Sequence, residues 1–68
     1  MINLRRNLAE NLRKRRGKLT QSKFARKAGI TQPSLNRIEQ GEQNVTLDTL
    51  QRICERLKCK PSDLLDPR

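Results

Sequence analysis

The sequence predicts an all-α domain, and two patterns indicate this class. Apolar residues recur every three or four positions, which places them on one face of a helix. No segment alternates apolar and polar residues with a period of two, so strands are not expected. The 68 residues are enough for one domain, spanning positions 1–68. We therefore expect a compact bundle of short helices.

The first helix is predicted from Met1 to about Arg16, because Leu4, Leu8 and Leu12 recur every four residues. The end of this helix is followed by a short break at residues 17–19.

The second helix is predicted between Thr20 and Gly29. Thr20 is a suitable N-cap, and Gly29 stands where a left-handed backbone conformation ends one helix and redirects the chain. Thr31 then caps a third helix. Pro33 lies in the first turn of that helix, where an N–H group would have no partner within the helix, so a proline is tolerated. Gly41 ends this third helix.

Two further helices are predicted after a polar loop. Thr46 opens the fourth, with Asp48 near its positive end. Its apolar stripe consists of Leu47, Leu50, Ile53, Cys54 and Leu57. A fifth, short helix begins at residues 61–63 and is expected to leave Leu64 and Leu65 exposed.

Composition excludes several classes of function. The sequence has 16 basic and 7 acidic residues, a formal net charge of +9, and no His, Trp or Tyr. Histidine acid–base chemistry and aromatic platforms for stacked bases are therefore absent. A domain of this size buries only about 60% of its unfolded surface, so we expect no deep substrate cavity and no enzymatic activity. No apolar run reaches the length of about 20 residues that spans a bilayer, so we expect a cytoplasmic protein without a membrane partner.

The two cysteines do not have the spacing of a metal or redox motif. Four residues separate Cys54 from Cys59, whereas a redox pair is separated by two and a zinc site needs further ligands. We expect reduced thiols that act as small apolar core residues, and neither a metal nor a cofactor.

Residues 20–40 have the pattern of a helix-turn-helix. Ala25 is small enough for two helices to approach closely, and Gly29 permits the sharp turn between them. The residues expected to hold the second helix of the pair against the core are Ile30, Leu35 and Ile38.

The outward face of the third helix carries side chains that match base edges. This face holds Pro33, Asn36, Arg37 and Gln40, with Gln32 on its flank. Arginine can donate two hydrogen bonds to guanine. Glutamine or asparagine can form two hydrogen bonds with adenine, and an apolar group can contact the methyl group of thymine. The face therefore indicates reading of the major groove of double-stranded DNA, with a merely solvated surface as the alternative.

Several short motifs occur together along the chain. They are Thr20-Gln21, Phe24-Ala25, Ala28-Gly29-Ile30, Thr31-Gln32-Pro33-Ser34-Leu35, Arg37-Ile38-Glu39-Gln40-Gly41-Glu42 and Leu47-Asp48-Thr49-Leu50. From about Leu8 to Leu65 the chain resembles the Cro and phage-repressor (XRE-like) helix-turn-helix family. The resemblance implies a compact, five-helix, lambda-repressor-like domain that binds operator DNA as a dimer.

The resemblance also implies roles for particular positions. The base-reading positions are Gln32, Pro33, Ser34 and Arg37, to which the outward face adds Asn36. Gln21 is implied to touch a phosphate and to brace Gln32. The full set expected to contact phosphate or to position the domain is Thr20, Gln21, Lys23, Thr31, Gln40, Gly41, Gln43 and Asn44.

The chain departs from the family pattern first at the junction of the first two helices, where Lys18 and Leu19 separate Gly17 from Thr20.

Three single positions also depart from the pattern, and one acidic residue is expected to have a partner within the chain. Pro33 replaces a residue that often donates hydrogen bonds, Val45 stands where many members have proline, and Lys58 stands where many have glycine. Glu39 is expected to pair with an arginine within the chain rather than to repel DNA.

The predicted function is sequence-specific regulation of transcription. We expect a repressor that binds an inverted-repeat operator as a homodimer, with its recognition helices about 34–36 Å apart. Such a protein would lie on the nucleoid when bound to DNA. The alternative is a protein-interaction module, such as an antitoxin or a restriction-modification controller subunit, whose DNA binding depends on a partner. Exposed Leu64 and Leu65 would leave that alternative open.

Overall fold

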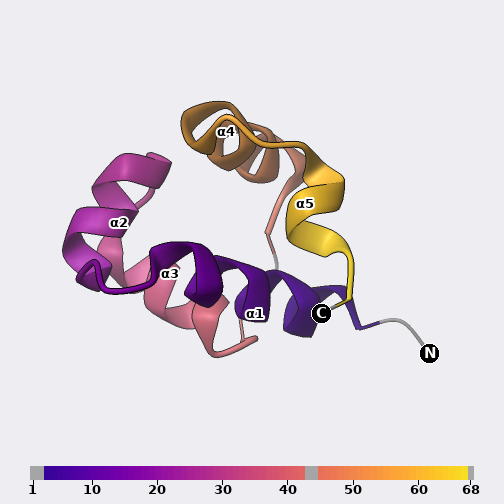
Figure 1. Cartoon of the computed structure of the whole chain (residues 1–68), viewed down its shortest axis with the longest axis horizontal. Helices are drawn as coiled ribbons and strands as arrows, with labels where there is room; N and C mark the ends of the chain where they lie inside the picture. The colour runs from indigo at the N-terminus through magenta and orange to yellow at the C-terminus, as the bar shows by residue number, and fades with distance from the viewer. Residues whose placement is uncertain (1–2, 43–44, 68) are drawn as a thin grey trace.

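The computed structural model describes residues 3–42 and 45–67, and it arranges them as five helices around one core (Figure 1). The helices are α1 (Leu4–Arg16), α2 (Gln21–Ala28), α3 (Gln32–Glu39), α4 (Leu47–Leu57) and α5 (Pro61–Leu65). No strand occurs within these two ranges, so the all-α class and the order of the elements are confirmed. Gln43 and Asn44, which were predicted to contact phosphate, lie outside the described residues.

Side-chain caps fix where the first four helices begin. Asn3 accepts a hydrogen bond from the N–H of Arg6 at 3.0 Å, so α1 begins at Leu4 rather than at the predicted Met1, which lies outside the described residues. The predicted threonine caps are confirmed. Each threonine hydroxyl accepts from the N–H three residues on, in the pairs Thr20 with Lys23, Thr31 with Ser34 and Thr46 with Thr49. Each cap contributes about 1 kcal/mol.

Helices α2, α3 and α4 end in the same way. A residue with positive φ follows the last turn, namely Gly29 at 78°, Gly41 at 73° and Lys58 at 56°. The next N–H then donates to a carbonyl in the last turn at 3.0 Å, in the pairs Ile30 to Ala25, Glu42 to Arg37 and Cys59 to Cys54. This geometry satisfies carbonyls that the helix itself leaves free. The predicted ends of α2 and α3 are therefore confirmed.

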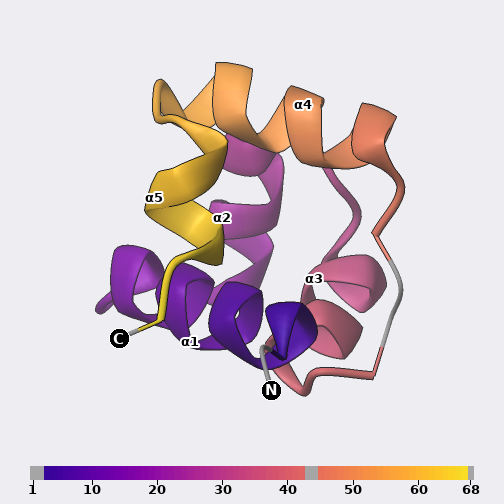
Figure 2. The same cartoon turned by 90° about the vertical axis from the view of Figure 1, so that its right-hand side faces the viewer.

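The core is formed by apolar side chains from all five helices. Its largest fully buried members are Phe24, Leu12, Leu35, Ile38, Ile53 and Leu64. Figure 2 shows α1 and α4 on opposite sides of the molecule, with α2 and α5 between them. Cys54 is buried and Cys59 half-buried, and both are free thiols. The prediction that the cysteines serve as core residues is thus confirmed for Cys54.

The expectation of an exposed Leu64 is wrong, because α1 holds α5 against the core. The Nδ2 group of Asn11 donates to the carbonyls of Leu64 at 2.8 Å and Asp66 at 2.9 Å. Asn7 donates in the same way to the carbonyl of Leu65 at 3.0 Å. These bonds satisfy carbonyls that a short helix cannot pair internally. Leu64 is fully buried as a result, and only Leu65 remains half-exposed.

Candidate nucleic-acid interface

The turn between α2 and α3 is covered by two arginines from α4. A Cβ atom at Gly29 would lie 3.2 Å from Cγ of Arg56 and 3.4 Å from Cδ of Arg52. The guanidinium of Arg56 also donates to the carbonyl of Arg26, near the end of α2, at 3.2 Å. A glycine is needed here both for its left-handed backbone and for this close packing. Helix α4 therefore helps to fix the angle between α2 and α3.

Helix α3 buries one face and exposes the predicted reading face. Leu35 and Ile38 are buried in the core. The predicted residues Gln32, Pro33, Asn36 and Arg37 are all exposed, whereas Ser34 is half-buried. The structure thus places four of the five predicted base-reading side chains in solvent, on the part of α3 that the core does not use.

A buried carboxylate joins three helices beneath this face. Glu39, only 4% exposed, accepts from Nε of Arg16 at 2.8 Å and from its Nη2 at 3.0 Å. The same carboxylate accepts from Nε2 of Gln21 at 3.1 Å. This arrangement pairs both carboxylate oxygens and gives Glu39 the arginine partner that it was expected to have.

Gln21 does not brace Gln32 as predicted. Its Nε2 group donates to Oδ1 of Asn36 at 3.2 Å as well as to Glu39. The crossing of the helices brings the start of α2 against the second half of α3, whereas Gln32 stands at the start of α3. Asn36 is therefore the reading-face residue that Gln21 positions.

Arg16 is a residue next to the predicted reading face that the sequence did not reveal. The available signal was Glu39, which stands four residues after Leu35 and therefore on the core side of its helix. A carboxylate at a buried position needs a cation. Which arginine supplies it depends on how α1 crosses α3, and the sequence pattern does not give that crossing.

The first turn of α2 combines several features that favour an anion. The hydroxyl of Thr20 caps the helix by accepting from the N–H of Lys23. The N–H groups of Gln21 and Ser22 come before the first N–H that bonds within the helix, so they have no partner there. Lys23 is exposed in the same turn. Free N–H groups, the positive end of a helix and a lysine together favour an anion. Thr31 is also exposed, with its hydroxyl used to cap α3.

A hollow with two arginines lies beside the end of α3. It brings Arg6 and Arg13 of α1 next to Gln40 and Gly41, two of the predicted positioning residues. Arg6 pairs with Glu10 at 3.1 Å, across an exposed turn. The sequence reasoning missed Arg13, although Arg6 and Arg13 are seven residues apart and so share one helix face.

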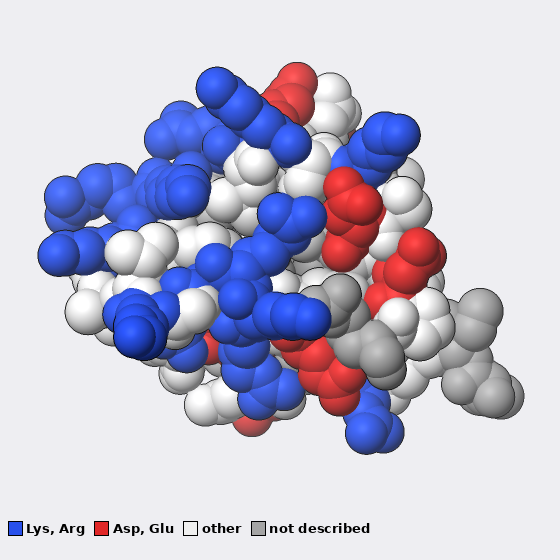
Figure 3. All heavy atoms as spheres, viewed as in Figure 1, with Lys and Arg blue, Asp and Glu red and all other residues white. Residues whose placement is uncertain are grey.

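The positive charge is unevenly distributed. In the view of Figure 3, Lys and Arg side chains gather over α2 and the second half of α1, whereas much of the acidic surface lies toward α5. The described residues include no helix long and apolar enough to cross a membrane. They also contain no group of three or more His, Cys, Asp or Glu side chains arranged around a metal.

Comparisons with known proteins agree with this geometry. A family model described as the Cro/C1-type HTH DNA-binding domain matches residues 7–68. An uncharacterised HTH-type transcriptional regulator from Bacillus subtilis, YozG, is 33% identical over 52 residues, which cover 75% of this chain and 62% of that protein.

A solved structure shares the arrangement of the helices. The crystal structure of the hypothetical transcription factor NHTF from Neisseria superposes with a TM-score of 0.81 at 27% identity. The match covers 94% of this chain and 76% of the solved one. With residues 7–68 matched by the family model, the chain belongs to the Cro/C1-type helix-turn-helix DNA-binding domain family.

Proposed function

We propose that this protein is a sequence-specific regulator of transcription, which represses by occupying an operator as a homodimer. The observation that carries the proposal is the exposed face of α3, where Gln32, Asn36 and Arg37 project from a helix whose other face is fixed in the core. The net charge of +9 adds a general attraction to DNA. Occupancy of DNA rather than catalysis produces the effect.

The residues of α3 have distinct roles in reading the major groove. Arg37 donates two hydrogen bonds to a guanine, and Asn36 or Gln32 pairs with an adenine. Pro33 supplies an apolar contact to a thymine methyl. Ser34, half-buried, contributes from the flank. Asn36 is the most restricted of these side chains, because Gln21 holds its amide oxygen.

Two phosphate contacts orient α3 in the groove. One is at the start of α2, from Thr20, Gln21 and Lys23, and Thr31 adds its own helix terminus. The other is beside Gln40 and Gly41, where the side chain of Arg13 supplies a positive charge. Contacts of this kind set the position of the domain without conveying sequence.

A homodimer would give the operator its symmetry. Two recognition helices about 34–36 Å apart meet successive turns of the same side of the duplex, so the half-sites lie about 10 bp apart in an inverted repeat. We expect a specific dissociation constant of about 10⁻⁸–10⁻¹¹ M. The protein would act in the cytoplasm, on the nucleoid.

Selection from a randomised duplex pool at about 150 mM salt tests this function, because specific binding exceeds the screened background at that ionic strength. The expected result is an enriched inverted repeat with half-sites one helical turn apart. Enrichment of no sequence, with binding that vanishes as salt rises, would overturn the proposal in favour of a module whose specificity comes from a partner.

A further inference from the structure

The two cysteines meet at the turn that ends α4. Lys58, in its left-handed conformation, folds the chain back, and the N–H of Cys59 donates to the carbonyl of Cys54 at 3.0 Å. In this kind of helix ending, the residue after the turn packs its side chain against the residue that supplies the carbonyl. Two cysteines five positions apart would lie on different faces of a continuous helix, but this turn makes them neighbours.

The backbone hydrogen bond limits how far apart the two residues are. Because the nitrogen of Cys59 and the oxygen of Cys54 are 3.0 Å apart, the lengths of the covalent bonds keep the two Cα atoms within about 7 Å of each other. Only beyond about 7 Å does a disulfide require movement of the backbone. The separation of the Cα atoms therefore allows a disulfide between Cys54 and Cys59.

Two other described helices end with the same turn and show what the thiols add. The corresponding pair is Ala25 with Ile30 in α2 and Arg37 with Glu42 in α3. The pair in α2 is apolar, as is usual for this ending. In α4 both positions hold cysteine, which packs like a small apolar residue and can also form a covalent bond. The thiol pair therefore has a chemistry that the other two pairs lack.

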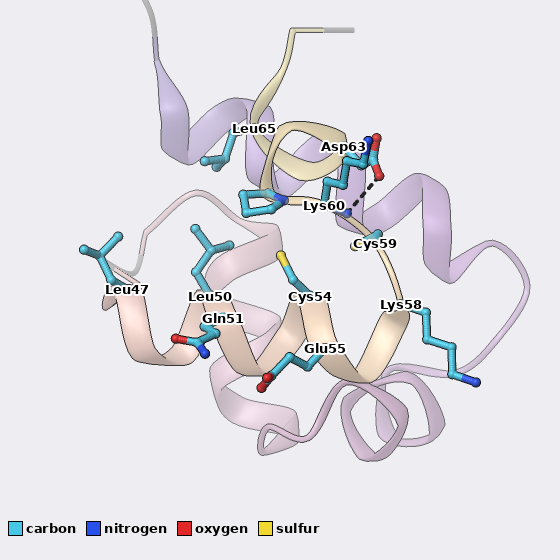
Figure 4. Close-up of a pocket in the computed structure, with 11 residues that line it drawn as sticks. Leu47, Leu50, Gln51, Cys54, Glu55, Lys58, Cys59, Lys60, Asp63 and Leu65 are labelled. Atoms are coloured by element: carbon cyan, nitrogen blue, oxygen red, sulfur yellow. Dashed lines mark hydrogen bonds between the residues drawn. The ribbon is translucent and has the colours of Figure 1, made fainter.

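The two thiols differ in their access to solvent. Cys54 is 6% exposed and belongs to the core, whereas Cys59 is half-buried. Both line the hollow between α4 and α5, and Figure 4 shows the thiol of Cys54 pointing from α4 toward the connection on which Cys59 lies. A small oxidant that enters the hollow therefore reaches Cys59 more easily than Cys54.

The charged side chains around the hollow are of both signs. Those that line it are Glu55, Lys58, Lys60 and Asp63. Two acidic and two basic groups give the lining no net charge, and hydrogen peroxide is itself neutral. The hollow therefore admits a small neutral hydroperoxide without electrostatic exclusion.

The ionisation of Cys54 supports an order of reaction. Burial, followed by the neighbouring Cys59 thiol, raises the pKa of Cys54 to about 11. Asp63 adds to this rise, and Arg15 opposes it. Near neutral pH the Cys54 thiol is therefore protonated, and since the thiolate is the nucleophile, Cys59 is the thiol that meets an oxidant first.

We propose that Cys54 and Cys59 form a redox pair, which a hydroperoxide oxidises to an internal disulfide and a small dithiol returns to the reduced state. In a reducing compartment such a bond is usually transient and reports oxidation. The reading-face residues Gln32, Asn36 and Arg37 do not line this hollow, so the proposal is independent of the proposed function.

The oxidation takes two steps. The thiolate of Cys59 attacks one oxygen of hydrogen peroxide, the O–O bond breaks, and the departing hydroxide takes up the proton that Cys59 released and leaves as water. Cys59 then carries a sulfenic acid. The sulfur of Cys54 loses its proton and attacks the sulfur of Cys59, the S–O bond breaks, and the hydroxide leaves with that proton as water. Two thiols and one peroxide thus give one disulfide and two waters, with two electrons passing from sulfur to oxygen.

Mass spectrometry of the reduced full chain after treatment with hydrogen peroxide tests the proposal. The expected product has lost two hydrogen atoms and regains them with dithiothreitol. Trypsin cuts after Arg56 and Lys58, between the cysteines, so the peptides that carry Cys54 and Cys59 should stay joined until they are reduced. Thiols that instead gain oxygen atoms, or a disulfide that joins two chains, would overturn the proposal.

Single variants assign the two roles. Cys54→Ala should stop at the sulfenic acid of Cys59, which dimedone captures. Cys59→Ala should lose thiol to peroxide at least about tenfold more slowly than wild type, because the remaining thiol is buried. Oxidation of folded Cys59→Ala at the wild-type rate would show that Cys54 reacts by itself and would remove the paired mechanism.

A matched control keeps two thiols but moves one of them by a single residue. Lys60 is exposed, and its N–H donates to Asp63 at 2.9 Å rather than to Cys54. The double variant Cys59→Ser/Lys60→Cys should therefore close an internal disulfide at least about tenfold more slowly than wild type. Circular dichroism checks that its helices are retained. Closure at the wild-type rate would mean that the turn at Lys58 does not select the pair, contrary to the proposal.

Discussion

Arg16 and Glu39 form a two-bonded ion pair, at 2.8 and 3.0 Å, that joins the end of α1 to the end of α3. Gln21 extends this pair to the reading face, because its amide donates both to Glu39 and to Asn36. A chain of hydrogen bonds thus connects a buried charge to a residue proposed to read a base. The pair supports the fold and orients the recognition helix at the same time.

Loss of Arg16 should destabilise the domain strongly. Arg16→Met keeps much of the side-chain length but leaves the carboxylate of Glu39 buried without its cation, which costs about 3–5 kcal/mol. Urea unfolding followed by circular dichroism measures this loss. Arg15→Met is the control, since Arg15 is exposed and lies 4.0 Å from Asp63, a surface pair worth about 0–1 kcal/mol. Equal midpoints for the two variants would contradict a structural role for the Arg16–Glu39 pair.

Replacement of Arg37 should affect specificity more than general affinity. Arg37→Ala removes a side chain proposed to contact one guanine, so binding to the selected operator should weaken by about 1–3 kcal/mol and the preference at one base pair should relax. Lys23→Ala, at the proposed phosphate site, should weaken binding to all sequences alike. Titrations on operator and scrambled duplexes distinguish the two. Equal losses on both duplexes for Arg37→Ala would exclude it from the reading set.

Arg13 should contribute to the salt dependence of binding. If the dimer neutralises about 6–10 phosphates, the logarithm of its affinity falls with the logarithm of salt concentration at a slope near −5 to −9. Arg13→Ala should make this slope shallower by about one for each phosphate that is no longer neutralised, hence by about two in a dimer. Lys60→Ala is a suitable control, because Lys60 lies in the hollow between α4 and α5. An unchanged slope for Arg13→Ala would remove Arg13 from the phosphate-binding residues.

The helix boundaries were predictable because they depend on local chemistry. Thr20, Thr31 and Thr46 cap the helices that follow them, and Gly29 and Gly41 adopt the positive φ that ends α2 and α3. Each of these features involves residues only a few positions apart. Periodicity likewise predicted which face of α3 is exposed, since burial of one side determines which side remains in solvent.

The contacts between helices were less predictable, because they depend on crossing angles. Gln21 contacts Asn36 rather than Gln32. Glu39 forms its ion pair with Arg16 rather than with another basic residue of α1. Leu64 is buried because Asn11, far away in the sequence, holds the end of α5. Periodicity gives the inward face of each helix but not the residue opposite to it.

The two cysteines should differ in reactivity. Burial, followed by the neighbouring Cys59 thiol, raises the pKa of Cys54 from 9.0 to about 11. Since the thiolate is the reactive form, a disulfide reagent at about pH 8 should label Cys59 first. Because the pKa is raised by folding, the contribution of Cys54 to stability is complete below pH 9.0 and is lost as pH rises through about 11.

The labelling is best measured by mass spectrometry of the folded protein. Replacement of Cys59 by serine should leave no rapidly labelled thiol until denaturant is added. Fast labelling of that folded variant would show that the Cys54 thiol is accessible and ionised, contrary to its burial.

Lys58 offers a route to a more stable domain. This residue ends α4 with φ 56° and ψ 49°, a left-handed conformation that costs an ordinary L-residue about 1–2 kcal/mol and glycine much less. After allowance for the greater freedom of glycine in the unfolded chain, Lys58→Gly should stabilise by about 1 kcal/mol and raise Tm by about 4–8 °C. Lys58→Ala removes the same charge but keeps the strain, so thermal unfolding at equal protein concentration should show no such gain. An equal rise in Tm for Lys58→Gly and Lys58→Ala would indicate relief of charge repulsion instead, because only the glycine variant relaxes the backbone.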